Sequence, residues 1–148
     1  METDLLADLI DRKLQALELL TKIAQQQCAL IDGGDMTRLL QLLSAKQTLL
    51  NHMQQLDQNL ELFRGQDADA RVWVTPAKRA RCQEQAERCN QLLAGLMELE
   101  KRDEAVMIRR RDEVAERLHG VHNAAAARQA YAADRAVVRP GIDLAMEG

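Results

Sequence analysis

The feature that most constrains this chain is a short break between two leucine-rich segments. Apolar residues recur at helical spacing over residues 14–31 and again over residues 36–60. Between them stands Asp32-Gly33-Gly34-Asp35, where either glycine can take the left-handed conformation that ends a helix. Asp35 can then cap the next helix by accepting hydrogen bonds from free amide groups of its first turn. Because so short a connection returns the second helix antiparallel to the first, the sequence predicts a helical hairpin.

The composition indicates an all-α protein. Hydrophobic residues make up 47% of the 148 residues, but aromatic residues only 2%, so leucine and alanine must supply the burial. We predict one antiparallel bundle of three long helices followed by a mobile alanine-rich C-terminal arm. The predicted helices span residues 4–31, 36–64 and 76–121, within a bundle of residues 1–123 and an arm of residues 124–148.

Each predicted helix carries an apolar stripe. In the second helix the stripe includes Leu43 and Leu56, which we expect to lie in the core, and Lys46, which is either a snorkelling stem or a charge paired across the bundle. Thr75 and Pro76 fit the cap and first position of the third helix.

Two parts of the third helix depart from this pattern. Glu100 and Asp103 interrupt its apolar stripe, which indicates that the helix extends past its partners there or packs more loosely against them. Farther on, residues 124–133 are rich in alanine and offer little apolar area, which favours a mobile arm. We expect Arg139-Pro140-Gly141 to end any helix and to leave an apolar tail.

Trp73 lies in the only aromatic-centred cluster outside the predicted helices. We expect it to pack over the open end of the bundle. The alternative is an exposed anchor for a partner protein.

Charge and hydropathy narrow the functional classes. The net charge of −3 argues against nucleic-acid binding, although Arg109-Arg110-Arg111 leaves that alternative open. An acidic N-terminus argues against a secretory signal, and no apolar run has the length of a membrane span. We therefore expect a cytoplasmic protein without membrane insertion.

Residues suited to catalysis or metal binding are few. Cys28, Cys82 and Cys89 have no zinc-ligand spacing and are interpreted as small buried hydrophobic residues. His119 and His122 are three residues apart, but no further histidine or cysteine lies near them in the sequence. No nucleophile has a recognisable catalytic setting, so we expect no enzymatic activity, no cofactor and no metal.

The hairpin resembles that of the FlgN-type flagellar export chaperones. The resembling residues are Leu14-Gln15-Ala16-Leu17-Glu18-Leu19-Leu20, Ala29-Leu30-Ile31-Asp32-Gly33-Gly34-Asp35 and Leu39-Leu40-Gln41-Leu42-Leu43-Ser44-Ala45-Lys46-Gln47-Thr48-Leu49-Leu50. The family pattern is a helix that ends in a Gly-Asp turn, followed by a lysine about eleven residues after that aspartate. Asp35 and Lys46 match it.

The resemblance implies a chaperone that binds C-terminal helical segments of hook-associated flagellar proteins and delivers them to the flagellar export gate. It places client binding in the C-terminal helical region, where Val114, Leu118 and Val121 share one stripe and are the expected client contacts. It also implies that a tyrosine near that region docks to the export gate. Tyr131 is the only tyrosine, and packing on the bundle is its alternative role.

Two other classes of function remain open from the sequence. One is a coiled-coil structural or adaptor protein that acts by self-association, which would appear as a homodimer. The other is a helical nucleic-acid-associated protein that uses Arg79, Arg81, Arg88 and Arg109 to Arg111.

Overall fold

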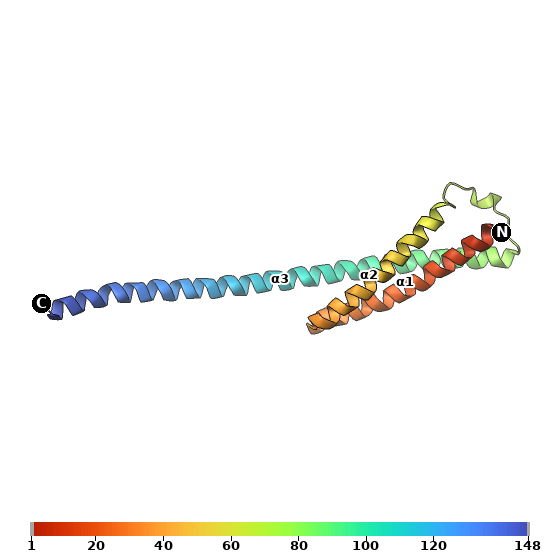
Figure 1. Cartoon of the computed structure of the whole chain (residues 1–148). Coiled ribbons are helices and arrows are strands. Elements are labelled where there is room, and N and C mark those ends of the chain that lie inside the picture. The colour runs from red at the N-terminus through yellow and green to blue at the C-terminus, as the bar shows by residue number, and fades with distance from the viewer. Residues whose placement is uncertain (1, 148) are drawn as a thin grey trace. The chain divides into compact units, whose positions relative to one another are not determined.

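A computed structural model describes the backbone of residues 2–147 and the side chains of residues 2–135. Within these residues the chain is all-helical, which confirms the predicted class. The elements are α1 (Glu2–Gly33), α2 (Met36–Glu61), the single turn η1 (Ala68–Ala70) and α3 (Pro76–Glu147) (Figure 1). The chain divides into Met1–Ala105, here called the hairpin unit, and Val106–Gly148, here called the arm unit.

The break between α1 and α2 forms as the sequence predicts. Gly34 has a φ of 73°, in the left-handed region, and the amide of Asp35 donates to the carbonyl of Leu30 at 3.2 Å. The Asp35 side chain then accepts from the amide of Arg38 at 3.1 Å and caps α2. Gly34 therefore ends the first helix, and Asp35 starts the second.

Polar contacts show the direction of each helix in the hairpin unit. Lys13 of α1 pairs with Asp57 of α2 at 2.9 Å, whereas Gln27 of α1 meets Lys46 of α2 at 3.1 Å. Early residues of α1 thus contact late residues of α2, so α2 runs back along α1. The contacts of α3 follow the opposite order. Gln85 donates to Asp11 at 2.8 Å and Gln27 to Asp103 at 2.9 Å, so α3 runs in the direction of α1.

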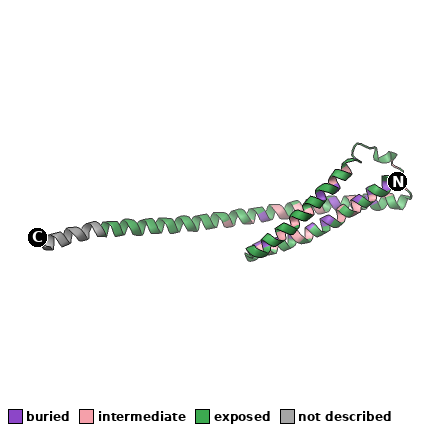
Figure 2. Ribbon diagram, viewed as in Figure 1, coloured by how far each residue is buried: buried purple, intermediate pink, exposed green. Residues whose placement is uncertain are grey.

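The core of the hairpin unit is built from leucine with a few other apolar side chains, and Figure 2 shows its buried positions. Phe63, just after α2, is a buried member of this core. Its buried members are Leu6, Leu9, Ala16, Leu17, Leu20, Met53, Leu56, Phe63 and Cys89.

The buried face of α2 differs in one respect from the predicted stripe. Leu56 is 3% exposed, as expected, but Leu43 is 38% exposed, so its expected place in the core is wrong. Leu42 is the more buried of the two neighbours at that step. Residues 42 and 43 are both leucine. The buried positions of α2 follow an alternating three- and four-residue repeat, and Leu42 lies in that repeat whereas Leu43 does not.

A polar layer links all three helices near the α1–α2 turn. It consists of Gln27, Lys46, Glu100 and Asp103. Gln27 donates to Asp103 at 2.9 Å, and Lys46 donates to Gln27 at 3.1 Å and pairs with Glu100. Asp103 is only 3% exposed, so α3 does not pack loosely at this interruption of its stripe. Lys46 is a charge paired across the helices rather than a stem reaching to solvent.

Within the arm unit, the described side chains of α3 are mostly exposed. Every side chain of residues 111–135 is exposed. The two compact units divide after Ala105, and the boundary at residue 123 stays a prediction.

The predicted end of α3 at residue 121 and the predicted stop at Pro140 are also not observed, since the helix continues to Glu147. A single internal proline removes one backbone hydrogen bond and costs about 3 kcal/mol, which disfavours a helix without forbidding it. The side chains of the predicted apolar tail, Ile142, Leu144 and Met146, lie outside the described residues.

The difference between Leu56 and Leu43 predicts unequal effects of truncation. Leu56→Ala should lower the free energy of unfolding by about 2–5 kcal/mol, because it leaves a cavity in the core. Leu43→Ala should lower it by less than about 1 kcal/mol, because this side chain is already partly in water. Urea denaturation measures both values, and equal losses would contradict the assigned buried face.

The polar layer predicts a second asymmetry. Asp103→Ala removes the acceptor of Gln27 and leaves a buried amide unpaired, so it should cost about 1–3 kcal/mol in unfolding free energy. Glu98→Ala, on the exposed face of the same helix, is the control and should cost within about 0.5 kcal/mol. Urea denaturation of the two variants tests this, and matching midpoints would show that the layer adds nothing to stability.

Candidate functional site

An open groove lies between α2 and α3 of the hairpin unit, with a volume of about 950 Å³. Its floor includes Leu17 and Leu20 of α1, and its apolar walls are Leu50, Met53, Leu93, Leu96 and Met97. Leu50, Leu93 and Met97 are all exposed. Large apolar side chains gathered in an open groove are typical of surfaces that bind a partner.

Charged side chains surround this groove. Glu100 and Lys46 of the polar layer lie at one end, together with Lys101 and Glu104. Asp57 and Glu61 lie toward the other end, and both already have cationic partners: Asp57 pairs with Lys13 at 2.9 Å, and Glu61 with Arg64 at 2.9 Å. The groove is thus an apolar surface with a mixed-charge border.

The arm unit carries the three client-contact residues expected from the sequence. Val114, Leu118 and Val121 are all exposed, and Leu118 is 65% exposed. Spacings of four and three residues place them on one face of α3. The structure therefore presents them together as an apolar stripe, and within residues 2–135 nothing buries that stripe.

The same repeat extends backward along α3. Alternating steps of three and four residues from Val114 reach Met107, Glu104, Met97 and Leu93. Glu104, Met97 and Leu93 also line the groove. Leu93 and Leu96 lie on the apolar stripe that the sequence predicts for this helix, whereas the groove that they line was not predicted.

Tyr131 is 63% exposed and does not pack into a core. The Arg135 guanidinium lies over its ring, 4.7 Å from the centroid. The two residues are four apart on α3, so this contact forms within the helix itself. Tyr131 is thus presented on the surface of the arm unit with a cation beside it.

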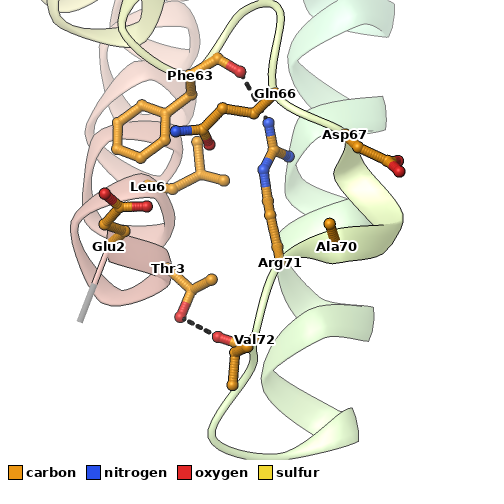
Figure 3. Close-up of a pocket in the computed structure, with 9 residues that line it drawn as sticks. All are labelled: Glu2, Thr3, Leu6, Phe63, Gln66, Asp67, Ala70, Arg71 and Val72. Atoms are coloured by element: carbon orange, nitrogen blue, oxygen red, sulfur yellow. Dashed lines mark hydrogen bonds between the residues drawn. The ribbon is translucent and has the colours of Figure 1, made fainter.

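Trp73 packs against the core of the hairpin unit, as expected, and its two valine neighbours are exposed. The loop that carries it covers a pocket of about 430 Å³, drawn in Figure 3. Thr3 donates to the carbonyl of Val72 at 2.8 Å, and Arg71 donates to the carbonyl of Phe63 at 3.0 Å. The first bond fastens the loop to α1, and the second fastens Arg71 of the loop to Phe63. This pocket therefore belongs to the loop structure that covers the hairpin unit.

The three cysteines are free thiols, and two of them are buried. Burial raises the pKa of the Cys82 and Cys89 thiols above its usual value. The pKa of the half-buried Cys28 is raised as well, first by burial and then by the neighbouring Asp103. Because the thiolate is the reactive form, these environments suit packing rather than nucleophilic or redox chemistry.

Metal ligands do not gather in the described part of the chain. No group of three histidine, cysteine or acidic side chains there could hold a metal ion. His119 and His122 both lie exposed on α3.

Two of the arginines that the sequence offers for nucleic-acid contact are paired with acidic side chains. Arg79 pairs with Asp69 at 3.3 Å, and Arg111 with Asp112 at 3.3 Å. Such pairs weaken the concentrated positive potential that phosphate binding needs.

Comparison of this chain with known protein families, curated proteins and solved structures found no match. Among the described residues, no helix combines the length and the apolar character needed to cross a membrane.

Proposed function

We propose that this protein is a cytoplasmic flagellar export chaperone without enzymatic activity. In this proposal the hairpin unit is an antiparallel bundle, and the C-terminal part of α3 is a mobile arm. The arm binds C-terminal helical segments of hook-associated flagellar proteins and delivers them to the export gate. The observation that carries the proposal is the exposed stripe of Val114, Leu118 and Val121.

The hairpin residues that resemble the chaperone family have defined structural roles. Asp35 caps α2, and Lys46 joins α2 to Gln27 of α1 and Glu100 of α3. Both residues therefore stabilise the hairpin unit. Their positions support the family assignment because the family pattern combines the same turn and lysine.

The stripe suits a helical client on physical grounds. An amphipathic client helix can lay its apolar face along the three side chains, since residues three and four apart form a continuous ridge. A client that is disordered when free loses conformational entropy as it orders, so its affinity stays moderate and its release stays easy. A delivery chaperone needs that combination.

Tyr131 is the proposed contact with the export gate. It lies ten residues beyond Val121, on a part of α3 where every described side chain is exposed. An exposed tyrosine offers both an apolar ring and a hydroxyl group, which is why tyrosine is frequent in binding hot spots. Client and gate contacts would thus be separate along one helix.

Calorimetric titration with the C-terminal segment of a hook-associated protein tests client binding. Leu118→Asp should weaken binding at least about tenfold, because it places a charge on the apolar stripe. Asn123→Asp is the matched control: it adds the same charge about half a turn away from the stripe and should leave affinity within about twofold. Equal losses in both variants would contradict client binding at this stripe.

Motility assays test the role of Tyr131. Tyr131→Ala should keep client affinity near that of the natural chain and impair delivery of hook-associated proteins. Truncation before Ala124 should leave a stable hairpin unit with lost delivery. Normal export by Tyr131→Ala would remove this residue from the proposed gate contact.

A further inference from the structure

Two arginines border the exposed apolar stripe of the arm unit. Arg117 lies four residues before Val121, and Arg128 lies seven residues after Val121, so the three side chains are neighbours along one edge of α3. The two arginines are about 16 Å apart along the helix axis, which is about three turns. Both belong to residues 111–135, whose side chains are all exposed (Figure 2).

Most acidic side chains of the same segment lie on the other side of the helix. Asp112 and Glu116 each precede a stripe residue by two positions, which is about half a turn. Asp134 lies thirteen residues after Val121, which again places it about half a turn from the stripe. The helix is therefore amphipathic in charge as well as in hydropathy.

The guanidinium groups at the stripe edge are available to a partner. Within the described part of the chain, neither Arg117 nor Arg128 has an ion partner. Glu113 lies four residues before Arg117 on the same edge, but no ion pair joins these two described side chains. An exposed pair of that kind is weak, so it would not prevent Arg117 from binding a carboxylate of another molecule.

We propose that the arm unit binds an amphipathic helix whose apolar face is bordered by carboxylates. The partner's apolar side chains cover Val114, Leu118 and Val121. Its acidic side chains, about three turns apart along one edge, pair with Arg117 and Arg128. This inference rests on the proposed function, because it names the chemistry of the client that the stripe receives.

Arginine beside alanine suits this contact. The planar guanidinium can donate two parallel hydrogen bonds to a carboxylate, which a lysine cannot do. Ala124 and Ala125 lie between the two arginines, and their small side chains let a partner helix approach closely. Apolar contact along the stripe then excludes water beside the charge pairs, which strengthens their attraction.

Two other anionic partners fit this helix less well. A helix that lies in a membrane surface needs a large apolar face, whereas this face continues from Val121 with alanine. Nucleic acid needs a concentrated positive potential, and three acidic side chains lie within about two turns of Arg117. These three are Asp112, Glu113 and Glu116.

Calorimetric titration of the full chain with synthetic helical peptides tests the inference. The first peptide has a leucine face and two glutamates eleven residues apart along one edge of that face. An isomer has the same composition, with both glutamates on the opposite face. The first peptide should bind at least about tenfold more tightly than the isomer, because only its glutamates can meet the two arginines. Added salt should reduce the difference.

Charge reversal on the chain should reverse the preference. The double variant with Arg117→Glu and Arg128→Glu should bind a third peptide, with lysines in place of the two glutamates, at least about tenfold more tightly than the glutamate peptide. Arg109→Glu is the matched control. Arg109 lies about half a turn from Leu118, so its reversal should leave the natural preference within about twofold. Circular dichroism checks that each variant keeps its helices.

Three results would overturn the inference. They are equal affinities for the two isomers, a double variant that keeps the preference of the natural chain, and an equal loss of preference in Arg109→Glu. Phosphatidylserine vesicles and a DNA duplex are titrated in parallel. Tighter binding of either one than of the glutamate peptide would assign the arginines to that partner instead.

Titration with the C-terminal segment of a hook-associated protein separates this inference from the proposed function. If the glutamate peptide shows the expected preference but the hook-associated segment does not bind, the chemistry of the stripe stands and the chaperone proposal fails. If the segment binds through Leu118 and the double arginine variant binds it as tightly as the natural chain does, the proposed function stands and this inference fails.

Discussion

The hydrogen bond between Gln27 and Asp103 sets the relation of the helices more narrowly than any apolar contact does. Both side chains are buried, one on α1 and one on α3, and Lys46 of α2 completes the set. Leucine contacts tolerate sliding, because neighbouring leucines offer alternative faces. A buried amide and carboxylate do not, because a shift of one residue would separate the Gln27 amide group from its Asp103 acceptor. The polar layer thus fixes the register of the hairpin unit.

Local signals in the sequence were sufficient for the turn and the helix starts. Gly34 and Asp35 form the predicted break because only short-range geometry decides it. Contacts between residues far apart in the sequence were not predictable. The burial of Asp103 depends on Gln27, which lies 76 residues earlier. The selection of Leu42 over Leu43 depends on which repeat the other two helices follow.

The part of the candidate site that depends on local spacing was predicted from the sequence, and the part that depends on helix packing was not. Val114, Leu118 and Val121 share a helix face by spacing alone, so the sequence suffices to group them. The groove needs the relative placement of α2 and α3, which no local pattern contains. The exposure of Tyr131 likewise followed from the structure, since the sequence left packing and docking open.

An unburied apolar stripe is the structural basis of the proposed function. The hairpin unit holds its own core, whereas the large apolar side chains of residues 111–135 are all exposed. Such a segment gains stability only from a partner.

Amide hydrogen exchange, measured on the protein alone and with the proposed hook-associated client, tests the central claim most directly. The account predicts that residues 111–135 exchange much faster than the core of α1 when the protein is alone and dilute. It also predicts that the Val114–Val121 segment becomes protected when a hook-associated client is added. Exchange in this segment that is unchanged by client, or already as slow as in α1, would contradict the account.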